Sequence, residues 1–215
     1  MKFFNKAKHL IAVLFLICNP FTAKAALITI DFGGTLTSTF GTLTSGQAFS
    51  GSYTFDAAVA ATGASTSSFS AFNNLLSASL TIGSFTATVG PGSGLPEIQQ
   101  DDVAGADRYA LLARNAIGSS QVGGLDIDAF GFRLDDTSGT AITDALVLLA
   151  SPSLANFTGN SLFIFFGSFT GPSGFVDGRL TSLSVRNTNV PEPEILLLLG
   201  AAAASFSMAR KRVNK

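Results

Sequence analysis

The chain has 215 residues, of which 13% are charged and 47% are hydrophobic, and its formal net charge is -1. Because globular proteins usually contain about 25% charged residues, this composition excludes a charge-rich disordered protein and a nucleic-acid-binding protein that relies on a basic surplus. Every lysine lies in residues 1–25 or 191–215, whereas residues 26–190 contain five arginines and twelve acidic residues, which indicates targeting segments on both sides of an acidic domain.

Residues 1–25 have the pattern of a secretory signal peptide. Lysines precede an apolar run at residues 10–18, and Ala23-Lys24-Ala25 forms a small-x-small cleavage site. Cleavage there would leave Ala26 as the first residue. The pattern therefore predicts export of the chain by the general secretion machinery.

The predicted cleavage also removes His9 and Cys18, the single histidine and the single cysteine of the chain. The mature protein would then contain no histidine-based or cysteine-based nucleophile, no thiolate–imidazole metal site and no disulfide. Carboxylates, arginines, Tyr53 and Tyr109 remain for acid–base chemistry. Without disulfides, packing alone must hold the exported domain together.

Residues 26–189 are predicted to form an all-β domain, an antiparallel β-sandwich with a jelly-roll-like arrangement. Alternating or continuous apolar runs predict strands at residues 27–32, 49–55, 76–82, 85–89, 109–114, 125–134, 162–169 and 175–185, separated by Gly, Pro, Ser and Asn clusters. Short helices are expected at residues 67–75 and 144–150. Residues 162–166 are apolar at every position, which predicts a central strand buried on both faces rather than a ligand cleft.

The acidic residues of this domain raise two alternatives to a purely structural role. Paired carboxylates can hydrolyse glycosides, and the same side chains can bind calcium in a loop such as residues 94–107. The calcium candidates are Asp101, Asp102, Asp107, Asp126 and Asp128, the last two on one face of a predicted strand; the pair Asp135-Asp136 lies at a predicted turn. No Asp-x-Asp-x-Asp-Gly run is present, and no tryptophan is available to stack on a sugar. We therefore expect no catalytic residues and no metal cofactor, and interpret the aspartates as solvated turn residues.

Residues 190–215 combine three features in a fixed order. Pro191-Glu192-Pro193 lacks two backbone donors and should be extended and accessible. An uncharged run of fifteen residues follows, beginning with the anchor residues Ile195, Leu196, Leu197, Leu198 and Leu199; as a helix it would span about 22 Å of a hydrocarbon core of about 30 Å. The basic stop Arg210, Lys211 and Arg212 comes next and favours a cytoplasmic C-terminus. The segment is therefore predicted to be a marginal transmembrane anchor.

This order resembles the PEP-CTERM sorting signal of exported proteins of Gram-negative bacteria, over residues 190–215 only. In that family the tripeptide is the recognition feature for an exosortase, a membrane-embedded cysteine peptidase that passes its substrates to the cell envelope or the exopolysaccharide matrix. The resemblance implies that Pro191, Glu192 and Pro193 are the recognised residues. Glu194 departs from the small or apolar residue that commonly follows the tripeptide.

Together these patterns favour an exported, non-catalytic cell-envelope or exopolysaccharide-matrix (biofilm) protein. It would be held by the inner membrane until exosortase processing and would then reside at the cell surface or in the extracellular matrix. Its β-sandwich would act as a structural or binding module, with exopolysaccharide as a candidate partner and no nucleic acid. The alternative is a secreted carbohydrate-active enzyme or lectin-like domain that uses aspartates on a sheet face.

Overall fold

Twelve antiparallel strands form one sheet in the computed structural model, which describes residues 27–57, 60–66, 68–73, 75–90, 97–103, 105–168 and 170–187. These residues belong to one compact unit, Ala25–Thr188. The predicted signal peptide with its cleavage site, and segment 190–215 with the tripeptide, the apolar run and the basic stop, lie outside the described residues. Within the described ranges, no helix is long and apolar enough to cross a membrane.

The strands range from 2 to 15 residues in length, and residues 137–158 form the longest connection between two of them. Their bounds are β1 (Leu27–Leu36), β2 (Ala48–Asp56), β3 (Thr62–Thr66), β4 (Phe69–Phe72), β5 (Leu75–Ile82), β6 (Phe85–Val89), β7 (Glu97–Val103), β8 (Ala106–Arg114), β9 (Ile117–Gly118), β10 (Ile127–Asp136), β11 (Gly159–Gly167) and β12 (Ser173–Asn187). A short 3-10 helix, η1 (Leu154–Asn156), precedes β11. The order across the sheet is β3-β4-β7-β8-β10-β11-β12-β1-β2-β5-β6-β9.

The alternation of apolar and polar residues gives the sheet two different faces. In β6, for example, Phe85, Ala87 and Val89 are buried, whereas Thr86 and Thr88 are exposed. Successive side chains of a strand point to opposite faces, so each such strand has one apolar side. The described residues contain no second sheet and no α-helix to cover that side, so the sheet buries it by curling onto itself.

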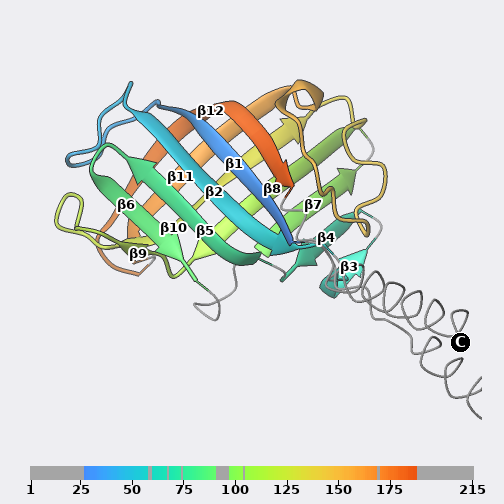
Figure 1. Ribbon diagram of the computed structural model, residues 1–215, viewed down its shortest axis with the longest axis horizontal. Helices are drawn as coiled ribbons and strands as arrows, with labels where there is room; N and C mark the ends of the chain where they lie inside the picture. Colours follow the sequence, from blue (N-terminus) through green and yellow to red (C-terminus); the bar gives the residue numbers. More distant parts are fainter. Residues whose placement is uncertain are drawn as a thin grey trace, which may run out of the picture. The chain divides into compact units, whose positions relative to one another are not determined.

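The sheet curls so that β1, β2, β5 and β6 pack across β8, β10 and β11 (Figure 1). Aromatic side chains fill the space between these halves: the ring centroids of Phe32 and Phe132 are 5.4 Å apart, and those of Phe85 and Phe166 are 5.9 Å apart. Aromatic contacts of this kind contribute more than their buried area alone. The fold is therefore all-β and antiparallel, as predicted, with a sandwich-like core enclosed by one continuous sheet.

The predicted strands correspond to β1, β2, β5, β6, β8, β10, β11 and β12. Four further strands, β3, β4, β7 and β9, were not expected from the sequence. Residues 97–103 form β7 and residues 106–107 begin β8, so most of the described part of the predicted calcium loop at 94–107 is strand. Strand β7 lacks the alternation of apolar and polar residues that predicts a strand, because its fully buried residue Gln100 is as polar as its neighbour Gln99.

Both helix predictions are wrong. The described residues of 67–75 include strand β4 (Phe69–Phe72), which pairs with β7. Residues 144–150 form turns and bends, in which the Leu146 N–H donates to Asp144 Oδ1 and the Val147 N–H donates to the Asp144 carbonyl. An aspartate that bonds to its own turn offers the backbone an alternative to a helix.

The prediction for the phenylalanine-rich strand is also wrong. In β11, Leu162, Ile164 and Phe166 are fully buried, but Phe163 and Phe165 on the opposite face are only half-buried. The strand therefore buries one face and presents the other at the outer surface. Five successive apolar residues reflect a core on one side and an aromatic surface on the other.

Candidate binding groove

The aspartates predicted as candidate ligands lie in three places. Asp126 and Asp128 lie at the start of β10, where their backbone carbonyls accept from the N–H groups of Gly167 and Ala116 at 2.7 and 2.9 Å. Asp102 and Asp107 are cross-strand partners of β7 and β8, near the opposite end of β10. Asp101 points to the outer face. The five residues therefore do not converge on one site.

Asp136, at the end of β10, organises the loop that follows it. Its carboxylate accepts hydrogen bonds from the N–H groups of Ser138 and Thr140, each at 2.9 Å, and of Ala141 at 3.2 Å. The Ser138 hydroxyl donates to it as well. These bonds, led by those of the Thr140 and Ser138 backbone, hold the pKa of Asp136 well below its ordinary value. Asp136 therefore acts as a structural anchor.

Two further buried polar side chains hold the same loop, residues 137–158, against the inner face of the sheet. Asp107 Oδ2 accepts from the Ile142 N–H at 2.8 Å. Gln100 donates to the Val147 carbonyl at 3.0 Å and accepts from the Leu149 N–H. Ile142 is 4% exposed and belongs to the core, so the loop closes the end of the apolar interior.

Asp107 Oδ1 is the one buried side-chain atom in the described part of the chain without a hydrogen-bond partner. Asp102 and Asp136 flank Asp107 in register on β7 and β10. In the described residues, however, no group of three or more Asp, Glu, His or Cys side chains is placed to hold a metal ion.

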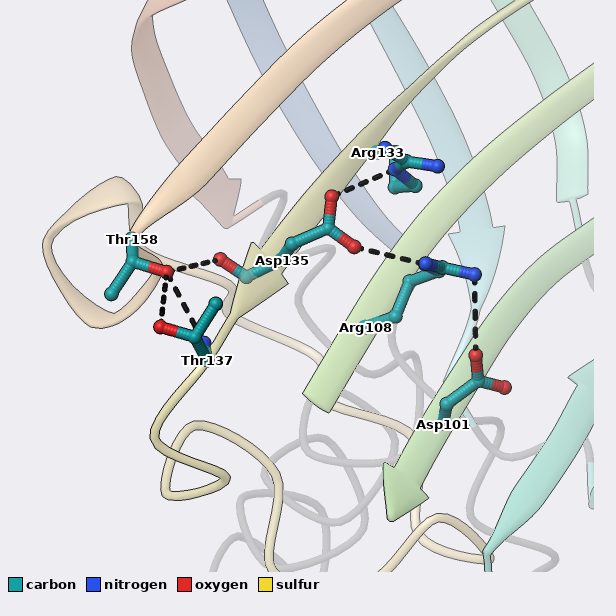
Figure 2. Close-up of polar contacts among 6 residues, drawn as sticks. All are labelled: Asp101, Arg108, Arg133, Asp135, Thr137 and Thr158. Atoms are coloured by element: carbon teal, nitrogen blue, oxygen red, sulfur yellow. Dashed lines mark hydrogen bonds and ion pairs between the residues drawn. The ribbon is translucent and has the colours of Figure 1, made fainter. Parts of the chain in front are cut away.

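On the outer face, two arginines share one aspartate (Figure 2). Nε of Arg108 lies 2.9 Å from Asp135 Oδ1, and Nε of Arg133 lies 2.7 Å from Asp135 Oδ2. Arg108 Nη1 reaches Asp101 Oδ2 at 3.7 Å. Partial burial raises the pKa of Asp101, more than the Arg108 charge lowers it, and the Asp135 charge adds to the rise.

A groove of about 360 Å³ opens on this face beside the ion-pair cluster. Its lining residues come from five neighbouring strands, β7, β8, β10, β11 and β12: Gln99, Arg108, Ala110, Leu111, Leu112, Arg133, Ser161, Phe163, Phe175 and Asp177. The volume lies within the range of roughly 300–1,000 Å³ that is typical of ligand sites.

Strand register explains how residues far apart in sequence meet in the groove. Gln99, Ala110, Arg133 and Ser161 form one row across β7, β8, β10 and β11. The next row contains Leu112, Gly131, Phe163 and Asp177, on β8, β10, β11 and β12. Neighbours in such a row lie about 5 Å apart at Cβ, so their side chains face one ligand-sized space.

Small residues make the groove a depression in the sheet surface. Ala110 stands between the longer side chains of Gln99 and Arg133, and Gly131 lies beneath the ring of Phe163. A Cβ at position 131 would lie 2.6 Å from Phe163 Cζ and 2.0 Å from the Leu111 carbonyl oxygen. Glycine at this position therefore lets the phenylalanine ring lie flat along the outer face.

The groove offers hydrogen-bonding groups together with aromatic surface. Arg133 is bound to Asp135 through Nε, and its two terminal nitrogens have no partner in the described part of the chain. The Asp177 carboxylate is likewise without a partner in the described ranges, and Phe175 is 49% exposed. Donors, an acceptor and two rings thus face a common space.

These groove residues were not predicted from the sequence, because the phenylalanine run was interpreted as core and no arginine was assigned to a site. The alternation along β8 could have indicated which residues share the outer face: Arg108, Ala110 and Leu112 alternate with the buried Tyr109 and Leu111. The pairing between strands, which brings Arg133 beside Ala110, is not visible in such a pattern. No protein-family model, no curated protein and no solved structure matches the chain.

Proposed function

We propose that the chain is an exported, non-catalytic protein of the cell envelope or the exopolysaccharide matrix. In this proposal an exosortase recognises Pro191-Glu192-Pro193 and processes the chain near that tripeptide. The observation that carries the proposal is the order of tripeptide, uncharged run and basic stop in residues 190–215, behind a signal-peptide pattern in residues 1–25.

The physical properties of the tail support processing rather than permanent anchoring. An uncharged run that spans about 22 Å as a helix is short for a hydrocarbon core of about 30 Å, so it would hold the chain in the membrane only weakly. The two prolines would favour an extended conformation for the residues that precede them, which is the conformation that peptidases bind. The basic stop would keep the cleavable segment oriented with the β-domain outside.

The β-domain would be a structural or binding module rather than an enzyme. Glycoside hydrolysis uses two carboxyl groups on opposite sides of the scissile bond. Of the residues that line the groove, Asp177 is the one with a carboxylate, while the neighbouring Asp101 and Asp135 are engaged by arginines. Asp107 and Asp136 are committed to the loop at residues 137–158.

The proposal is tested by the mass and membrane partitioning of the mature chain in two hosts, one with and one without an exosortase. We expect loss of the segment that follows the tripeptide in the first host only. Pro191→Ala combined with Glu192→Ala should abolish this loss, because the recognition feature is gone. Glu194→Ala, next to the tripeptide but outside it, is the matched control and should still be processed.

Two results would contradict the proposal. One is a tail that persists in the membrane of both hosts, which would make residues 190–215 a simple anchor. The other is equal processing of the double variant and the control, which would show that the tripeptide is not read.

A further inference from the structure

We propose that the groove on the outer face binds a neutral polysaccharide built of hexopyranose units. This inference rests on the function proposed above and adds to it the class of ligand that the β-domain would bind. It rests on the residues of the groove itself and concerns binding without bond cleavage.

Aromatic rings at the groove provide the apolar part of such a site. Phe163 and Phe175 lie on adjacent strands β11 and β12, and both line the groove. Gly131 lets the Phe163 ring lie along the sheet, and Phe175 is 49% exposed. The C–H face of a pyranose ring is apolar and flat, so it can cover an aromatic ring and remove both surfaces from water.

Polar groups beside the rings match the hydroxyl groups at the edge of a sugar. The terminal nitrogens of Arg133 can donate in a fixed fork, and the Asp177 carboxylate can accept. The Asp135 carboxylate holds Arg133 by its Nε at 2.7 Å, so that the fork is positioned before a ligand arrives. A site whose groups are already oriented spends less of its binding free energy on ordering them.

The charges around the groove favour a neutral ligand over an acidic one. Arg108 and Arg133 are the cations of the lining, and Asp135 pairs with both of them. Asp101 and Asp177 add two more carboxylates at or beside the groove. A polyanion would therefore meet guanidinium groups that are already neutralised and a carboxylate that repels it.

A peptide strand is not favoured as the occupant. Strands β8, β10 and β11 are each paired on both sides, so the backbone groups beneath the groove are already used in the sheet. Adding a strand requires an exposed edge with unpaired backbone groups. The groove lies in the middle of the β7–β12 part of the sheet, where recognition must come from side chains.

Calorimetric titration of the full exported chain tests the proposal. The chain is purified in a zwitterionic detergent without a sugar headgroup, so that the detergent does not occupy the groove. The probes are cellohexaose, laminarihexaose, maltohexaose and mannohexaose as neutral chains, and oligogalacturonate as the acidic chain. We expect at least one neutral hexasaccharide to bind and oligogalacturonate not to bind. Mass spectrometry should show the bound sugar intact.

Matched variants locate the binding. Phe175→Ala should raise the Kd about tenfold or more, since it removes one stacking ring. Asp177→Ala should raise the Kd several-fold, because it removes the acceptor of the groove. The fold should be unaffected, because this exposed carboxylate has no partner in the described part of the chain. Phe69→Ala is the control: Phe69 is 40% exposed on the outer face of β4 but does not line the groove, so its loss should leave the Kd unchanged.

Failure of this proposal is distinguishable from failure of the sorting proposal, because the chain can be titrated whether or not its tail has been removed. Binding of oligogalacturonate alone, or of none of the neutral probes, would overturn the groove proposal. So would an equal loss of affinity in Phe69→Ala and Phe175→Ala. Sedimentation that shows dimers dissolved by Phe175→Ala, without sugar binding, would assign the face to a second copy of the chain instead.

Discussion

The hydroxyl oxygens of Tyr53 and Tyr109 lie 2.9 Å apart in the centre of the core, where both side chains are fully buried. Tyr53 belongs to β2 and Tyr109 to β8, so this hydrogen bond joins the two facing halves of the curled sheet. Each ring also packs against Phe132, at centroid distances of 5.7 and 6.4 Å. The pair satisfies two polar groups in an otherwise apolar interior.

A double-mutant cycle on this pair should show strong coupling. Tyr53→Phe or Tyr109→Phe alone leaves one hydroxyl buried without its partner, which should lower the free energy of unfolding by about 1–2 kcal/mol. The double variant should lose less than the sum of the two single variants, because it leaves neither hydroxyl orphaned. Urea unfolding measures all four free energies. Simple additivity would mean that the hydroxyls do not interact.

The same pair makes the fold sensitive to alkaline pH. Burial raises the pKa of Tyr53 and of Tyr109 well above the ordinary value, so the folded state holds both protons more tightly than the unfolded chain. Their contribution to stability is fully present below a pH of about 10 and is lost as the pH rises further. We expect phenolate absorbance to appear together with loss of the β-sheet circular dichroism signal. Phenolate that forms while the sheet is intact would refute this account.

Asp136 should make stability depend on acid. Because its folded-state pKa lies below the unfolded value of about 3.9, its stabilisation is present above that value and is lost as the pH falls through the folded-state pKa. Asp136→Asn should therefore be less stable than the wild type near neutral pH, and the difference should shrink in acid. Urea unfolding at a series of pH values tests this. A constant difference would place the effect in packing rather than in ionisation.

Gln100 should control the order of the loop at residues 137–158. Gln100→Leu keeps the buried volume similar but removes the hydrogen bonds to the Val147 carbonyl and the Leu149 N–H, which should cost about 1–3 kcal/mol. Hydrogen exchange at the Leu149 amide should become faster, while amides of β1 and β12 remain protected. Unchanged exchange at Leu149 would show that the loop is held by other contacts.

Asp135 should set the charge preference of the groove. Asp135→Asn leaves the guanidinium groups of Arg108 and Arg133 without their shared carboxylate, so binding of oligogalacturonate should appear or strengthen at low salt and weaken as salt is added. Asp31→Asn removes the partner of Arg186, on strands β1 and β12 and outside the groove lining, and is the matched control. Equal oligogalacturonate binding by both variants would contradict a local effect.

The sequence predicted the strands wherever apolar residues alternate over several positions, as in β5 and β6. The prediction from sequence failed where a polar residue is buried or an apolar residue lies at the outer surface. Gln100 is polar but fully buried, and Phe163 is apolar but only half-buried, so β7 was not predicted and the outer side of β11 was mistaken for core. The groove could not be predicted from the sequence, because the proximity of Ala110, Arg133 and Ser161 depends on the register between strands rather than on the residue pattern within one strand.

The pairing of β1 with β12 also determines when the fold can form. Ile28 pairs with Asn187, so the first and the last strand lie side by side in the middle of the sheet order. A chain that emerges from its amino end cannot complete this ladder until residue 187 is free, and contacts of such large sequence separation form slowly. In the export proposed above, the β-domain would therefore stay unfolded while the chain crosses the membrane, which is the state that translocation requires.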